Sequence, residues 1–182
     1  MSRDAAQAPI ALRLEPGTRV AAVVSGYHRE LCAAMAESAR RELEAAGLAA
    51  EDWLVVDAPG SFELPVIARR LALREDIDAV LCFGLVLKGE TRHDEYIASS
   101  VAHALQDLAL STGRPVLFGV LTCETLEQAR SRALPPELGG KQDKGREVAR
   151  AAVEVLAALE RAASIGSGRP AIGFQARKES KP

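Results

Sequence analysis

Short apolar runs alternate along most of the chain with longer segments in which apolar residues recur every three or four positions. The runs are rich in Val, Leu and Ala, which is typical of strands buried on both faces of a parallel sheet. The predicted strands cover residues 19–25, 52–56, 79–87 and 116–121. The periodic segments predict helices at about 29–46, 65–73, 94–111, 124–133 and 145–162.

This order of elements predicts a three-layer α/β/α sandwich around a four-stranded parallel sheet, because crossover helices cover the faces of such a sheet. The α/β domain is expected to span residues 18–163. Residues 1–17 are predicted to form an N-terminal arm, in which 9–14 could add an edge strand. Residues 164–182 are rich in Gly, Ser, Pro and charge and predict a flexible, solvated tail.

Composition and charge exclude several classes of function. The 182 residues carry 23 Lys and Arg against 25 Asp and Glu, so the net charge of −2 provides no field of one sign for nucleic acid. No apolar run reaches the roughly 20 residues of a membrane helix. Charged residues interrupt the N-terminal segment where a signal peptide would need an apolar core. We therefore expect a cytoplasmic protein without nucleic-acid or membrane partners.

The three cysteines, Cys32, Cys82 and Cys123, form no CxxC pair and stand in apolar surroundings. This pattern favours three small buried side chains in a reducing compartment over a disulfide framework or a zinc site, although a catalytic thiol stays open. No His, Asp or Glu spacing predicts a metal site. Glycine-rich dinucleotide and P-loop motifs are absent from the sequence.

Candidate chemistry gathers where the predicted strands end, because ligands of open parallel sheets bind outside the carboxyl ends of the strands. The chain has only one Trp, two Tyr and four Phe. Two of these aromatic residues, Tyr27 and Phe62, follow the first and second strands. They predict a stacking site for a planar ligand, unless they merely cover the edge of the core.

The turn from Gly89 to His93 follows the third strand. Gly89 lets the backbone approach a ligand closely, while Thr91 and the N–H groups of a helix start are suited to phosphate. His93 can move protons near neutral pH, or can serve only as a cap or surface residue. Arg132 and Lys144 flank a Pro- and Gly-rich loop and could bind phosphate or be solvated charges.

Four sequence blocks together resemble the lumazine synthase family. They are GSFELP (60–65), GLVLKGETRHDEYI (84–97), PVLFGVLTCETLEQARSRA (115–133) and DKG (143–145). The resemblance covers residues 18–160 and implies a flavodoxin-like fold. It also implies condensation of 5-amino-6-(D-ribitylamino)uracil with 3,4-dihydroxy-2-butanone 4-phosphate to 6,7-dimethyl-8-ribityllumazine, with loss of phosphate and water. It implies no cofactor and no metal.

The resemblance also implies a role for individual residues. His93 is the expected general acid and base, and phosphate contacts fall on Glu90, Thr91 and Arg132. The pyrimidine and ribityl contacts fall on Tyr27, Ser61, Phe62, Glu63, Leu85, Val86 and Leu87. Phe118 and Lys144 are expected to reach the site from a neighbouring subunit, whereas the residues alone place Phe118 in the core of the monomer.

The sequence departs from the family pattern at several positions. Tyr27 stands where Phe or Trp is usual, and His28 where Asn is common. The loop 133–143 has eleven residues and is rich in Pro, which favours a homopentamer or a decamer over a sixty-subunit shell. A family member that binds riboflavin or lumazine without catalysis is the alternative function, and an unrelated flavodoxin-like binder of a phosphorylated ligand such as FMN is the third.

Overall fold

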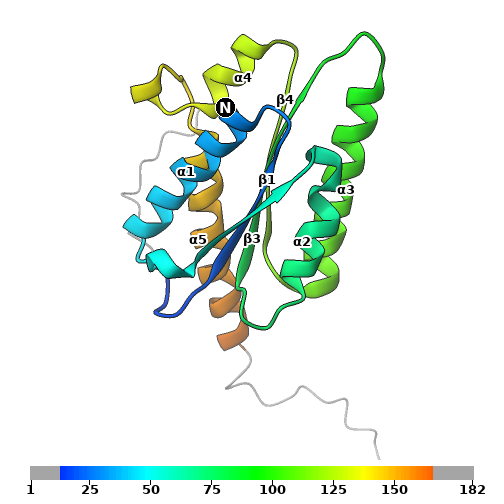
Figure 1. Ribbon diagram of the computed structural model, residues 1–182. Helices are drawn as coiled ribbons and strands as arrows, with labels where there is room; N and C mark the ends of the chain where they lie inside the picture. Colours follow the sequence, from blue (N-terminus) through cyan, green and yellow to red (C-terminus); the bar gives the residue numbers. More distant parts are fainter. Residues whose placement is uncertain (1–12, 166–182) are drawn as a thin grey trace, which may run out of the picture.

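A four-stranded parallel sheet is the middle layer of the computed structural model, which describes residues 13–165 (Figure 1). The strands are β1 (Val20–Ser25), β2 (Trp53–Ala58), β3 (Ala79–Leu87) and β4 (Val116–Cys123). Their order across the sheet is β2-β1-β3-β4, so β1 and β3 lie in the centre. The predicted fold class is confirmed, and each predicted strand is present.

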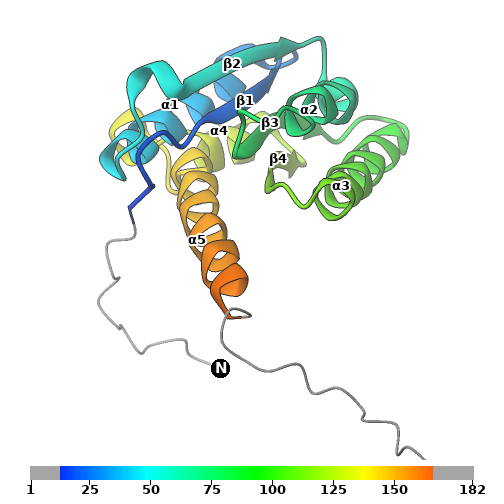
Figure 2. The same ribbon diagram turned by 90° about the horizontal axis from the view of Figure 1, so that it is seen from below.

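Helices cover both faces of the sheet, as the view from below shows (Figure 2). One face carries α1 (Arg29–Ala45), α4 (Leu126–Ala133) and α5 (Lys144–Ser164). The other face carries α2 (Leu64–Ala72) and α3 (His93–Thr112). The described residues also include three short 3-10 helices: η1 (Ala50–Asp52), η2 (Ser61–Glu63) and η3 (Pro136–Leu138). None of the helices in residues 13–165 combines the length and apolarity needed to cross a membrane.

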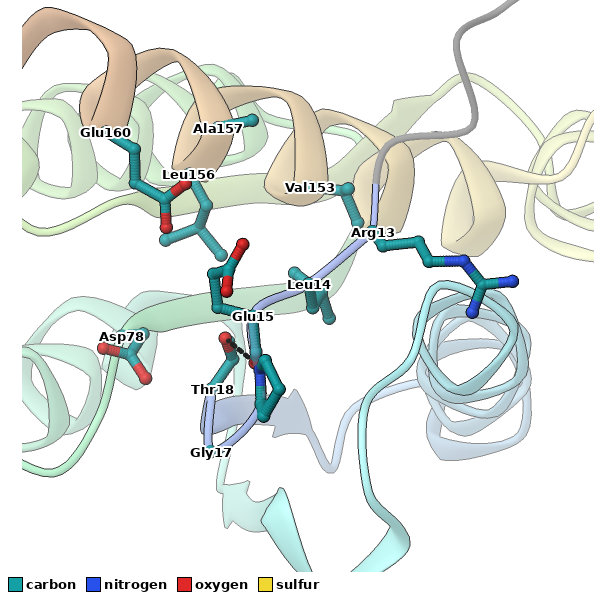
Figure 3. Close-up of a pocket in the computed structure, with 11 residues that line it drawn as sticks. Arg13, Leu14, Glu15, Gly17, Thr18, Asp78, Val153, Leu156, Ala157 and Glu160 are labelled. Atoms are coloured by element: carbon teal, nitrogen blue, oxygen red, sulfur yellow. Dashed lines mark hydrogen bonds between the residues drawn. The ribbon is translucent and has the colours of Figure 1, made fainter. Parts of the chain in front are cut away.

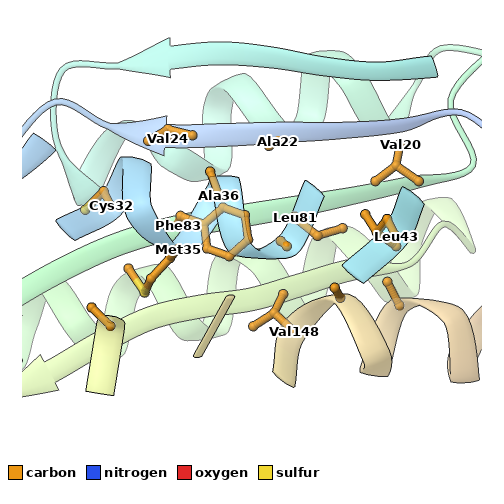
Figure 4. Packing of buried hydrophobic residues seen from close by; sticks show 14 of the residues in the cluster. Val20, Ala22, Val24, Cys32, Met35, Ala36, Leu43, Leu81, Phe83 and Val148 are labelled. Carbon is orange, nitrogen blue, oxygen red and sulfur yellow. The ribbon is translucent and has the colours of Figure 1, made fainter. Parts of the chain in front are cut away.

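The apolar character of the strands on both faces explains this layering. All six residues of β1 are buried, and alternate side chains enter two separate clusters. Val20, Ala22 and Val24 pack with side chains of α1 and α5, such as Met35, as Figure 4 shows. Ala21 and Val23 pack toward α2 and α3. Each face therefore needs its own helical cover.

The two ends of the domain are only partly described. Leu14 is buried, and its N–H donates to the carbonyl oxygen of Ala46 at 2.9 Å. Residues 13 and 14 belong to no strand, and the rest of the possible edge strand at 9–14 lies outside the described residues. The predicted tail lies outside them as well, except for Ser164, which closes α5, and Ile165.

The DKG block fastens the start of α5 to α1. The Asp143 carboxylate accepts from the Arg146 N–H at 3.0 Å, which caps α5, and from the Ser38 hydroxyl at 2.7 Å. A Cβ on Gly145 would overlap the carbonyl oxygen of Met35, so the backbones of the two helices touch there. Asp143 and Gly145 therefore hold α5 against α1. Lys144, which lies between them, forms an ion pair with Glu147 at 2.9 Å.

Replacing Gly145 with Ala tests this contact. Helix propensity alone would favour Ala by about 1 kcal/mol. We expect instead that Gly145→Ala lowers the free energy of unfolding by about 1–3 kcal/mol, because α5 must move away from α1. Urea denaturation measures the change. Ala151→Gly, at an exposed position of α5, is the control for propensity and should cost about 1 kcal/mol. A Gly145→Ala protein as stable as the parent would contradict the contact.

Candidate active site

A cavity of about 420 Å³ opens at the carboxyl ends of β1, β2 and β3, on the side of the sheet that α2 and α3 cover. Its volume suits a small organic ligand. Its lining residues are Tyr27, His28, Gly60, Ser61, Phe62, Glu63, Leu85, Val86, Leu87, His93 and Ile97. Eight of the thirteen residues predicted for the site are among them. The sheet brings these residues together because all its strands end at the same edge.

Two aromatic side chains project from the rim of the cavity. Tyr27 is 71% exposed and Phe62 is 59% exposed, so neither covers the edge of the core. Leu85 and Val86, both buried, form the wall at the end of β3. Exposed aromatic rings beside a buried aliphatic wall form a surface on which a flat ligand can stack.

The backbone turns sharply between β1 and α1. His28 has a φ of 54°, in the left-handed region, and directly precedes α1. Asn and Asp occupy this region more readily than other residues that carry a side chain. The Asn that is common here in the resembling family therefore matches the backbone, and His28 occupies the same conformation. The ring centroids of His28 and Tyr27 lie 5.7 Å apart, edge to face.

Ser61 links the turn after β2 to the end of β3. Its side chain is buried, and its hydroxyl donates to the carbonyl oxygen of Leu85 at 3.4 Å. A Cβ on Gly84 would lie 2.6 Å from the Ser61 hydroxyl oxygen. Gly84 thus provides the space in which Ser61 sits, and the two strand ends are held in a fixed relation.

His93 is the first residue of α3 and lines the cavity. Its Nδ1 lies 2.7 Å from the Thr91 hydroxyl oxygen. A Cβ on Gly89 would lie 2.6 Å from the His93 Cε1, so the neighbour of Gly89 in the structure is the imidazole ring. Glu90 and Thr91 belong to the loop that follows β3 and do not line the cavity themselves.

Phe118 does not lie at this cavity. In the sheet it is opposite Cys82, which comes three residues before Leu85, the first residue of β3 that lines the cavity. Three residues of strand span about 10 Å, and Phe118 is not among the lining residues. Phe118 is also 39% exposed. The placement in the monomer core that its residue type favours is therefore wrong.

Arg132 and Lys144 are also absent from the cavity. They belong to α4 and α5, which pack on the opposite face of the sheet. Arg132 donates to the carbonyl oxygen of Gln128 at 3.3 Å, within its own helix. Glu90, Thr91, Phe118, Arg132 and Lys144 are thus the five predicted site residues that do not line the cavity, and the last three lie on elements away from it.

Three lining residues were not predicted for the site. Ile97 lies four positions after His93 and therefore shares its face of α3, a spacing from which it could have been predicted. Gly60 precedes the predicted residue Ser61. His28 could have been predicted from its place after Tyr27.

The cysteines do not provide a reactive thiol. Burial raises the pKa of Cys32 to about 12. Burial also raises the pKa of Cys82, and that of Cys123 despite the nearby Arg132 charge. The prediction of buried side chains is confirmed, and at neutral pH their thiolate form is negligible. Within residues 13–165, no three His, Cys, Asp or Glu side chains lie close enough to hold a metal ion together.

A second cavity, of about 240 Å³, lies at the amino ends of β1 and β3 beside α5 (Figure 3). Its wall includes the carboxylates of Glu15, Asp78 and Glu160. None of the predicted site residues lines it. The first cavity is therefore the candidate active site.

Comparison with known proteins points to one family. The pattern of the family described as 6,7-dimethyl-8-ribityllumazine synthase matches residues 17–160. A relative of that name from Frankia casuarinae is 45% identical over 143 residues, which cover 79% of this chain and 86% of the relative. A relative of the same name from Thermus thermophilus is 41% identical over 145 residues, which cover 79% of this chain and 89% of the relative.

The left-handed backbone at His28 can be tested by substitution. We expect His28→Asn to preserve the free energy of unfolding and His28→Val to lower it by about 1–2 kcal/mol, because a β-branched residue is strained in this region. Urea denaturation of both variants measures the difference. His103→Val, on the exposed side of α3, is the matched control and should cost only a few tenths of a kcal/mol. Equal losses at the two positions would argue against strain at residue 28.

Proposed function

The chain belongs to the 6,7-dimethyl-8-ribityllumazine synthase family, and we propose that its condensation reaction takes place in the cavity at the carboxyl edge of the sheet. The chain is a transferase of riboflavin biosynthesis. It joins 5-amino-6-(D-ribitylamino)uracil to 3,4-dihydroxy-2-butanone 4-phosphate and releases 6,7-dimethyl-8-ribityllumazine, phosphate and water. The observation that most supports this site is the gathering of eight residues predicted from the family resemblance around one cavity.

The exposed rings and the apolar wall serve the pyrimidine. It stacks on Tyr27 and Phe62 and lies against the end of β3, from Leu85 to Leu87. Glu63 accepts hydrogen bonds from ribityl hydroxyls or ring N–H groups. The buried Ser61 fixes the turn that carries both Phe62 and Glu63.

His93 transfers protons between the reacting groups. Its imidazole takes a proton from the attacking amine and returns one as water or phosphate leaves. Holding the two substrates side by side lowers the activation barrier more than this proton transfer does, because effective molarity can supply about 7–11 kcal/mol in favourable cases. The phosphate sits at the Glu90 and Thr91 backbone N–H groups and the Thr91 hydroxyl, next to the start of α3, where a helix terminus favours an anion.

A neighbouring copy of the chain completes the site. Arg132, Phe118 and Lys144 do not line the cavity of their own chain, and in the proposed assembly they serve the cavity of the adjacent one. Arg132 then contacts the phosphate and stabilises the charge that develops as it leaves. A closed cyclic homo-oligomer gives every cavity such a neighbour. We place the enzyme in the cytoplasm as a pentamer or a decamer, which the long loop at 133–143 favours over a sixty-subunit shell.

Mixing the two substrates with purified protein tests the proposed function, with lumazine fluorescence as the readout. We expect product well above the uncatalysed rate. Folded protein that gives no product, yet binds riboflavin or lumazine tightly, would indicate a binding protein without catalysis. Light scattering on the same sample measures the mass, and an active monomer would contradict the shared site.

His93→Ala is expected to lower kcat by about 10- to 10⁴-fold, the range that loss of a general acid and base produces. The fluorescence assay measures it at saturating substrate. His103→Ala is the matched control, since His103 lies on the same helix but outside the cavity, and it should retain the parent rate. Equal rates for the two variants would show that His93 is not the general acid and base.

Mixed oligomers test whether Arg132 acts across an interface. Co-expressed His93→Ala and Arg132→Ala chains should regain activity, because in an equal mixture about one quarter of the sites combine an intact His93 with an intact Arg132 from the neighbour. A mixture of His93→Ala and Glu63→Ala is the control, since both side chains line the cavity of one chain, and it should regain none. No recovery in the first mixture would place Arg132 in its own chain's site.

A further inference from the structure

The Thr91 hydroxyl is bonded to one specific nitrogen of the candidate catalytic histidine. Its oxygen lies 2.7 Å from His93 Nδ1, a normal hydrogen-bond distance. A hydroxyl can donate to this nitrogen or accept from it, and the choice decides which nitrogen of the neutral ring carries the proton. Because Nδ1 is occupied, Nε2 is the nitrogen left to meet a substrate.

Gly89 fixes the same ring from another side. A Cβ at this position would lie 2.6 Å from His93 Cε1, 3.3 Å from Nδ1 and 3.5 Å from Nε2. The edge of the imidazole that bears both nitrogens therefore rests against the Gly89 backbone. Any side chain there would push the ring away from Thr91. Two residues of one short loop thus determine where the ring lies and which of its nitrogens is bonded.

We propose that Thr91 is a positioning residue whose hydroxyl sets the tautomer of His93, and that phosphate bound at Thr91 selects the form in which Nε2 is the base. The unprotonated oxygens of a bound phosphate can only accept from the Thr91 hydroxyl. The hydroxyl oxygen must then accept from Nδ1–H, which leaves Nε2 without a proton. When no phosphate is bound, the hydroxyl is free to donate to Nδ1, and the ring proton then resides on Nε2.

This arrangement returns the ring to its starting form after each turnover. Nε2 takes one proton from the amine as the carbon–nitrogen bond forms, and the ring becomes an imidazolium with Nδ1–H still bonded to Thr91. Nε2 then gives one proton to the departing hydroxyl, which leaves as water. The Nδ1 proton never moves. The inference rests on the proposed function, since the phosphate at Thr91 belongs to the butanone substrate.

Nitrogen NMR of the ring tests the tautomer directly and needs no activity. In protein labelled with ¹⁵N-histidine, the three histidines give three pairs of ring nitrogen signals, and His93→Gln assigns the relevant pair. At about pH 8, above the ordinary pKa of histidine, inorganic phosphate should shift the His93 signals toward the Nδ1–H form. Thr91→Ser should keep this response and Thr91→Val should lose it. An unchanged tautomer on adding phosphate, or an equal response in Thr91→Val, would overturn the proposal.

Kinetics supplies the second readout. Thr91→Val should lower kcat about tenfold, the worth of one neutral hydrogen bond, as well as raise KM for the butanone phosphate. Thr91→Ser should restore kcat to within about twofold of the parent value. Gly89→Ala should lower kcat without weakening the binding of inorganic phosphate, since the added Cβ displaces only the His93 ring. An unchanged kcat in Thr91→Val would show that the hydroxyl serves phosphate alone.

The chain offers a matched control on the same helix. The Ser99 Oγ lies 3.4 Å from the His103 Nδ1, away from the cavity, and the same nitrogen lies 2.7 Å from the Ser99 carbonyl oxygen. Ser99→Ala should leave both the rate and the phosphate response of the His93 signals unchanged. The two proposals can fail separately: parent protein that makes no lumazine yet shows the tautomer response refutes the function alone, and active protein without that response refutes the role of Thr91 alone.

Discussion

Strands β1 and β3 are buried on both faces along nearly their whole length, and the other elements are placed by the need to cover them. A buried strand with apolar residues on both sides leaves no room for polar groups within the sheet. Polar side chains and free backbone N–H groups can therefore gather only where the strands end. The candidate active site lies at one such edge, where the carboxyl ends of the strands meet.

This constraint also explains why one chain builds only part of a site. The strand ends bring together the rings, the aliphatic wall and the imidazole on the side of α2 and α3. The cations Arg132 and Lys144 are carried by helices on the other face, and the sheet separates them from the cavity. Tyr27 and Phe62, although large and aromatic, stay mostly exposed. Such a half-open surface supports the proposal that assembly, and not only folding, completes the site.

The sequence predicts most of the fold because continuous apolar runs and helical periodicity are strong local signals. It also predicts most of the cavity, since residues that follow parallel strands must meet at one edge. Phe118 shows where such reasoning fails: a strand's apolar character does not tell whether the strand is central or at the edge, and β4 is an edge strand. The left-handed backbone at His28 has no signal in the residue itself and was not predicted.

Three glycines show a further limit, because their role depends on partners that are distant or unspecified in the sequence. Gly84, Gly89 and Gly145 are not among the glycines with positive φ in residues 13–165, so conformational freedom does not explain them. Each leaves space for one group: the Ser61 hydroxyl, the His93 ring and the Met35 carbonyl. The first two groups belong to the cavity. The positions of the groups that would bind and react thus depend as much on side chains that are missing as on those that are present.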